Sequence, residues 1–355
     1  MKLKNVLYCA MSFVLIAVAV TCVCARIPRC FSADEAVIAA ASLTLSKGSL
    51  NSTVRIPAKK KIPKKKNKVE ETTAPPVTSS SFSEAYYNTF SDHKKAKKYP
   101  VYTKQYTAGG DKYENFYVKN NTDFELNIGK SLNNPLGFKL DDSDDVQVLI
   151  YHTHTSESYL DCDVGYYYSD YYPRTSDKRY NVTQVGEEIA NALRKEGLGV
   201  VHDTTEHDAA YTGSYARSRE TVYSYIKKYP KIKVTLDIHR DAIGADDYKI
   251  KPTFTYKGKK GAQIMIMSGY DEDGSFNFPN WNYNLRFALK LQQKCEADYG
   301  GMTRPLDFGN FAYNMNINSG SLLVEFGTDA NTLDEARYSG KLFGKALAQV
   351  LQNKT

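Results

Sequence analysis

Apolar and polar positions alternate with two rhythms along the second part of the chain. Short apolar runs, typical of buried strands, occupy residues 146–152, 198–203, 232–242, 262–269 and 321–328. Between them, apolar residues recur every three or four positions, as on one face of a helix, over residues 181–197, 214–230 and 282–299 and again from residue 332 onward. Strands that alternate with helices in this way predict an α/β fold with a mainly parallel sheet flanked by helices.

Local signals mark the ends of the predicted helices. The segment 181–197 carries its apolar residues on one stripe and stops at Gly197, and Pro230 ends the next helix. Thr332, followed three positions later by Glu335, fits a capping box at the start of the last helix.

The first 25 residues predict a membrane segment. An uncharged run of 20 residues extends from Val6 to Ala25, after Lys2 and Lys4. At about 1.5 Å per residue, a helix of this length spans a bilayer core. We expect residues 1–25 to form an uncleaved anchor. Because Val23 to Ala25 loosely resembles a cleavage site, a cleaved signal segment is the alternative.

The region between this segment and the folded domain has a different composition. Residues 26–100 are rich in Lys, Ser, Thr and Pro, which predicts a linker. Much of the net charge of +7 lies in one lysine-rich segment, Ala58–Lys68. A solvated tether is favoured over binding to anionic lipid or wall polymer, and nothing favours nucleic acid as a partner. Residues 101–140 predict a short strand-rich preface, and residues 141–355 a catalytic domain.

Tyrosine and cysteine usage add two observations. The chain has 28 tyrosines and one tryptophan. Tyrosine suits grooves that hold polar polymers, but its use as a strand former is the simpler interpretation. Outside the membrane run, the spacing of Cys30, Cys162 and Cys295 supports neither a disulfide framework nor a thiolate zinc site, although Cys162 and Cys295 could pair.

Histidines gather at the carboxyl ends of the predicted strands. His152 and His154 follow the first strand, His202 and His239 lie near the ends of the next two, and Glu325 ends a fourth. Repetition over several strands favours a shared site, because ligands bind beyond the carboxyl ends of parallel strands. His152 and His154 are two apart in a segment that we expect to be extended, so both side chains should point the same way.

The types of donor favour zinc catalysis. Two or three nitrogen and oxygen ligands without a nearby cysteine are typical of catalytic Zn²⁺. Zinc polarises carbonyl groups and activates water, so hydrolysis of an amide is the natural chemistry. Glu325 enters an apolar strand, where a carboxylate is costly unless it is paired or used. It is therefore a candidate proton carrier, with a strand-terminal ion pair as the alternative.

Motifs of other enzyme classes are missing from the sequence. It contains no G-x-S-x-G, no P-loop and no H-E-x-x-H. Interpretations as an α/β-hydrolase, a P-loop nucleotide-binding protein or a common zincin are therefore disfavoured.

Several segments, taken in order, resemble the stage II sporulation protein P family of endospore-forming bacteria, which are peptidoglycan hydrolases. They are "VLIYHTHTSESY", "NVTQVGEEIANAL", "HDTTEHD", "YTGSYARSRETV", "VTLDIHRDA" and "LLVEFGTDANTLDEA". The resemblance covers about residues 140–353, and an amino-terminal anchor with a variable linker also fits the family. It implies a relation to the zinc-dependent N-acetylmuramoyl-L-alanine amidases and therefore a six-stranded α/β fold.

The resemblance also implies roles for individual residues. His154 matches the first zinc ligand of the amidases, His239 their second histidine and Glu325 their catalytic glutamate. Where the amidases have a ligand glutamate at the start of the first helix, this chain has Tyr180 and Asn181. The third ligand is therefore open at this stage.

Three residues are available as the third ligand. They are Glu157, His152 and His207, and Glu157 is preferred because it lies close to His154 in the sequence. We expect Arg240 and Asp241, which follow His239, to orient the ligands or to contact substrate. The same role is the alternative for His207.

By resemblance, the reaction is cleavage of the amide between N-acetylmuramic acid and L-alanine of the stem peptide. An endopeptidase action on peptide cross-links is also attributed to the family. The implied partners are peptidoglycan and the engulfment proteins D, a lytic transglycosylase, and M. The implied place is the space between the mother-cell and forespore membranes. Two alternatives stay open: a metal-dependent endopeptidase, and a catalytically silent wall-binding or scaffold protein.

Overall fold

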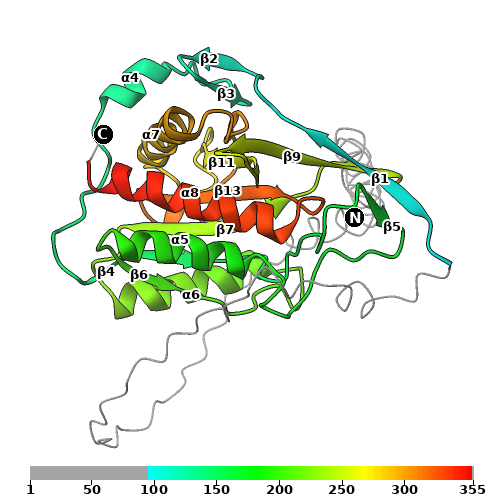
Figure 1. The fold of residues 1–355 in the computed structure, drawn as a ribbon. Coiled ribbons are helices and arrows are strands. Elements are labelled where there is room, and N and C mark those ends of the chain that lie inside the picture. Colours follow the sequence, from blue (N-terminus) through cyan, green and yellow to red (C-terminus); the bar gives the residue numbers. More distant parts are fainter. Residues whose placement is uncertain (1–94, 354–355) are drawn as a thin grey trace, which may run out of the picture. The chain divides into compact units, whose positions relative to one another are not determined.

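The computed structural model describes residues 95–353, which contain two β-sheets and a set of covering helices (Figure 1). The expected membrane segment and most of the expected linker lie outside the described residues. Within residues 95–353, no helix combines the length and the hydrophobicity needed to cross a membrane.

The larger sheet has eight strands in the order β2-β3-β12-β11-β13-β7-β4-β6. Their bounds are β2 Asp111–Tyr113, β3 Phe116–Asn120, β4 Val146–Tyr151, β6 Gly199–His202, β7 Val234–Asp241, β11 Ile264–Gly269, β12 Leu306–Gly309 and β13 Ser321–Thr328. The pairs β2–β3 and β11–β13 are antiparallel and the other neighbouring pairs are parallel. The prediction of a mainly parallel sheet is therefore confirmed. The six strands that the resemblance implied are too few, because β2 and β3 of the expected strand-rich preface join this sheet and the short strand β12 was not predicted.

Strand β4 shows why the predicted strands are almost continuously apolar. Val148 and Ile150 face the large core, whereas Leu149 and Tyr151 face a second cluster on the opposite side of the sheet. Successive side chains of a strand point to opposite faces, so a strand that is covered on both faces needs apolar residues throughout.

Helices cover both faces of the larger sheet (Figure 1). Residues of α5 (Thr183–Lys195), α7 (Trp281–Tyr299) and α8 (Leu333–Leu351) belong to the large core, and Val222 of α6 (Ser214–Lys228) belongs to the opposite cluster. A short helix, α4 (Ile128–Asn133), lies in the preface. The predicted capping box is confirmed, since Thr332 and Glu335 cap each other at the start of α8.

The smaller sheet was not foreseen. It consists of β1 (Lys98–Lys104), β5 (Tyr166–Tyr168), β8 (Gly244–Ala245), β9 (Tyr248–Tyr256) and β10 (Lys259–Ala262). The expected preface contributes most of β1 to this sheet, and β2 and β3 to the larger one, while Lys98 to Pro100 of β1 belong to the expected linker. Cys162 and Cys295 are both free thiols here, so the considered pairing is not formed.

Candidate metal centre

The site lies where three neighbouring strands of the larger sheet carry polar residues. His152 and His154 follow the end of β4, and His239 lies near the end of β7. Glu325 of β13 lies directly beside His239 in the pairing of β13 with β7. Three parallel neighbours thus bring these residues to one edge of the sheet, as expected from the positions of their strands.

His154, Glu157 and His239 form a compact group of possible metal ligands. One ligand atom from each lies within 4.8 Å of the others. The Nδ1 atoms of His154 and His239 are each 3.4 Å from a different carboxylate oxygen of Glu157. All three side chains are buried, which keeps them in a defined geometry. The structure therefore brings together Glu157 and the two histidines that were favoured from the sequence.

Main-chain contacts place Glu157 in this group. The chain turns after β4, so that the Glu157 N–H donates to the carbonyl of His154 at 3.1 Å. The carbonyl of Glu157 accepts from the N–H of Val182, the residue that caps α5, at 2.8 Å. Glu157 therefore lies in space at the start of α5, although it is distant from that helix in sequence.

Arg240 holds the loop that carries Glu157. Its backbone N–H donates to the Glu157 carboxylate at 3.1 Å, and its guanidinium donates to the carbonyls of Ser158 at 3.1 Å and Pro173 at 2.6 Å. Burial acts to raise the pKa of Glu157, but the charge of Arg240 and the side-chain contacts of His154 and His239 outweigh it and hold that pKa well below its usual range. Glu157 is thus an ionised carboxylate, as a metal ligand must be.

Asp237 orients His239 and was missed by the sequence analysis. One carboxylate oxygen lies 2.8 Å from His239 Nε2, at the distance of an ion pair. The same carboxylate accepts from the N–H and the hydroxyl of Thr153, at 2.8 and 2.6 Å. Burial acts to lower the pKa of His239, but Asp237 and Glu157 raise it well above its ordinary value. A carboxylate behind a ligand histidine is a common support of metal sites, and an acidic residue inside an apolar strand was the available signal.

His152 does not join the group, and the expectation that it points the same way as His154 is wrong. Residues 153–156 form a turn instead of continuing the strand, because Glu157 bonds back to His154. The ring nitrogens of His152 lie 2.8 Å from the carbonyl of Ile238 and 2.9 Å from Nε2 of His202. Both nitrogens are therefore occupied by the protein.

The other predicted residues have structural partners. His207 contacts the carbonyl of His152 at 2.7 Å and the hydroxyl of Thr221 at 2.9 Å. Asp241 forms an ion pair with Arg304 at 2.8 Å. Neither side chain belongs to the group of three possible ligands.

Glu325 differs from the carboxylates around it. Its side chain is half-buried, and its Oε2 is buried without a hydrogen-bond partner among the described residues. Burial raises the pKa of Glu325 to about 8, against the opposing charge of His239. A carboxylate without a partner, held beside possible metal ligands, can exchange a proton with a molecule bound there.

Glu325 also affects the stability of the folded chain. In the metal-free chain, Glu325→Gln is expected to raise the midpoint of thermal unfolding at pH 8 and to leave it nearly unchanged at pH 4. The pKa of Glu325 is about 8 in the folded chain against an ordinary value of 4.5, so folding is weakened as pH rises between these values. Each unit corresponds to about 1.4 kcal/mol, which makes the gain a few kcal/mol at most.

Thermal unfolding with a chelator at pH 4, 6 and 8 measures this difference. The exposed Glu125 supplies the matched control, and Glu125→Gln should show no such trend. A gain from Glu325→Gln that is equal at all three pH values would contradict the burial argument.

The donor set fits zinc. Two imidazoles and one carboxylate are a common ligand set of catalytic Zn²⁺, which keeps a further position open. The unpaired oxygen of Glu325 lies at the same edge of the sheet, next to His239 in register. His154, Glu157 and His239 would hold the ion, and acid would oppose its binding because His239 must lose its proton first.

Comparison with known proteins identifies the family. A model of the stage II sporulation protein P family matches residues 42–350. The chain belongs to this family. A curated relative, stage II sporulation protein P of Bacillus subtilis (strain 168), is 30% identical over 202 residues, which are 53% of this chain and 47% of the relative. The chain thus spans about half the length of that relative, and the family predicted from the sequence segments is confirmed.

Several solved structures of amidases are also matched. They include the N-acetylmuramoyl-L-alanine amidase AmiC2 of Nostoc punctiforme, with 13% identity, a TM-score of 0.34 and coverage of 60% of this chain and 98% of that one. The CwlD amidase of Clostridioides difficile, solved in complex with the GerS lipoprotein, has 13% identity, a TM-score of 0.34 and coverage of 58% and 97%.

Tyrosines flank the candidate metal centre of this stage II sporulation protein P family member. The ring of Tyr211 stacks on His154 with centroids 4.8 Å apart, and that of Tyr215 lies edge-on to His154 at 5.6 Å. Both come from the segment "YTGSY", where the tyrosines are four positions apart, at the start of α6. Their contribution was not foreseen, because a tyrosine in a sequence gives no sign of whether it packs or lines a site.

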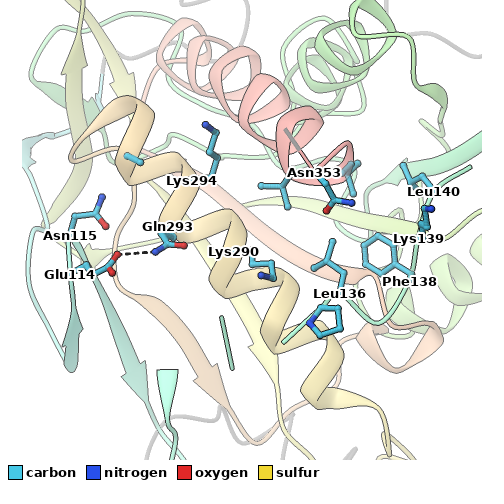
Figure 2. A pocket seen from close by; sticks show the side chains of 14 residues that line it. Glu114, Asn115, Leu136, Phe138, Lys139, Leu140, Lys290, Gln293, Lys294 and Asn353 are labelled. Atoms are coloured by element: carbon cyan, nitrogen blue, oxygen red, sulfur yellow. Dashed lines mark hydrogen bonds between the residues drawn. The ribbon is translucent and has the colours of Figure 1, made fainter. Parts of the chain in front are cut away.

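A large cavity of this family member lies elsewhere. It lies between α7, the end of α8 and the preface (Figure 2), and its volume is about 900 Å³. Its lining includes Phe138, Lys290 and Lys294, and none of the possible metal ligands. The candidate centre is therefore identified by its donor atoms and not by the size of a cavity.

Proposed function

We propose that this chain is a zinc-dependent peptidoglycan hydrolase that acts in sporulation. Its proposed reaction is cleavage of the amide between N-acetylmuramic acid and L-alanine of the stem peptide. The observation that carries the proposal is the convergence of His154, Glu157 and His239 beside Glu325, whose Oε2 has no partner among the described residues. Family membership supports the setting in sporulation.

Each residue of the site has a part in this reaction. When bound, zinc would supply a Lewis acid for the scissile carbonyl. Asp237 keeps the ring of His239 oriented, and Arg240 keeps Glu157 in place. Glu325 takes a proton from the attacking water and delivers it to the leaving nitrogen of L-alanine, while the carbonyl carbon gains the hydroxyl and the C–N bond breaks. Its pKa of about 8 suits such two-way transfer near neutral pH.

The proposal includes a place in the cell. Residues 1–25 would hold the chain in the membrane, with the catalytic domain outside the cytoplasm, between the mother-cell and forespore membranes. The engulfment proteins D and M would be its partners. This part is supported by the sequence resemblance, since the membrane segment lies outside the described residues.

Digestion of intact sacculi tests the proposal. The purified chain, loaded with zinc, is expected to release stem peptides whose alanine has a free amino terminus, and a chelator should stop the release. Mass spectrometry of the soluble products measures this outcome. Cleavage of peptide cross-links alone would indicate an endopeptidase, and binding to sacculi without any release would indicate a wall-binding protein; either result would overturn the proposal.

A further inference from the structure

Aromatic rings form a row that leads away from the candidate metal centre. We call Tyr215, Tyr313 and Phe311 the aromatic row. The ring of Tyr215 is nearly parallel to that of His239, at 11° with centroids 6.5 Å apart. Tyr313 follows at 5.3 Å and 28° from Tyr215, and Phe311 at 5.0 Å and 29° from Tyr313. At these spacings nearly parallel rings overlap only in part, so each keeps some surface for another contact.

The row borders an open hollow of about 530 Å³. Its lining includes the three rings of the row together with Phe276, Arg219 and Asn316. Tyr313 exposes 41% of its surface, although it lies against other aromatic residues. A concave surface that is mainly apolar and carries a few amide groups is typical of a ligand site.

Asn314 fixes the row between two elements. Its side-chain amide donates to the carbonyl of Tyr215 and to the hydroxyl of Ser218, both at 3.0 Å, and its carbonyl accepts from Arg219 at 3.0 Å. The loop after β12 is thereby held against α6. Tyr313 and Asn314 have φ angles of 40° and 61°, a left-handed conformation that is rare for residues other than glycine and frequent at functional sites.

We propose that the aromatic row is a subsite for the glycan strand of peptidoglycan. This rests on the proposed function, because the scissile amide would lie at the metal centre with its sugar directly attached. The C–H faces of pyranose rings are apolar and pack on aromatic rings. The side-chain amide of Asn316 donates to the carbonyl of Phe276 at 2.7 Å and accepts from Arg219, which leaves one N–H and one lone pair for the hydroxyl or N-acetyl groups of a sugar. Arg219 already donates to Asn314, Asn316 and Tyr223, so the hollow suits an uncharged sugar better than the carboxylates of a stem peptide.

Binding without hydrolysis tests the subsite. The probes are a peptide-free tetrasaccharide of alternating N-acetylglucosamine and N-acetylmuramic acid, with its lactyl carboxyls converted to amides so that it is uncharged, and a free stem peptide. Each is titrated calorimetrically into the full chain. Tyr313→Ala is expected to weaken tetrasaccharide binding about tenfold, by loss of one stacking partner, and to leave stem-peptide binding unchanged. Tyr313→Phe, which keeps the ring, should bind within about twofold of the unmodified chain.

Tyr102 on β1 supplies the control, since it is 56% exposed and belongs to the smaller sheet, so Tyr102→Ala should bind normally. The subsite would be disproved if the unmodified chain did not bind the tetrasaccharide, or if Tyr313→Ala bound it equally well or lost only the stem peptide. The proposed function can fail separately: a chain that binds glycan through Tyr313 but releases no stem peptide from sacculi keeps the subsite and loses the amidase activity.

Discussion

Glu325→Gln is expected to lower the release of stem peptides from sacculi about 10³-fold while zinc stays bound at one ion per chain. Glutamine has the size of glutamate but cannot accept and return a proton. Oε2 of Glu325 has no hydrogen-bond partner among the described residues, so the substitution breaks no buried bond at that atom. Glu325 is also absent from the group of three possible ligands, so metal content should not change.

Product release and metal content are measured on the same preparation, by mass spectrometry of muropeptides and elemental analysis of the protein. Glu125→Gln, at an exposed position of the preface, should retain full activity. If Glu325→Gln hydrolyses sacculi at the normal rate, the assigned role is wrong. If it loses zinc together with activity, Glu325 is a ligand and not a proton carrier.

Glu157→Gln is expected to lower zinc affinity by more than about 100-fold, beyond the loss typical of residues that only orient a ligand. A carboxamide carries no charge to offset that of the ion. The three-residue group would then hold two neutral imidazoles and no anionic ligand. Activity should fall with the zinc content. Competition with a chromogenic chelator measures the affinity.

His152→Gln is the matched comparison, because His152 was the other candidate ligand adjacent to the turn. We expect it to retain zinc within a few-fold but to lower the unfolding temperature, since His202 and the carbonyl of Ile238 lose a buried partner. The opposite pattern, in which His152→Gln releases zinc and Glu157→Gln retains it, would reassign the third ligand.

The sequence alone was sufficient where the signal is local. The runs around β4, β7 and β13 are apolar because helices cover both faces of the sheet, and the polar residues that interrupt them mark the edge where the candidate centre lies. The capping box at Thr332 was readable because the residues that satisfy each other are three positions apart.

The smaller sheet was missed because its apolar pattern is interrupted by charges whose partners are distant. Lys251 in β9 is almost fully buried, which its type argues against. It is tolerated because Glu335 at 3.0 Å and Asp163 at 2.8 Å neutralise it. Those partners lie on α8 and on a loop, so no window of sequence around Lys251 could reveal them.

The sequence by itself determined the family, the α/β class and the strand ends from which His154, His239 and Glu325 extend. Only the tertiary structure decided which neighbouring residue completes the group. The turn after β4 directs Glu157 towards His154 and His239, and leaves His152 paired with His202. That turn is held by Asp237 through Thr153 and by Arg240 through Glu157, more than 80 residues away in sequence. Contacts across such separations leave no local periodicity, so they become visible only when the strands are side by side.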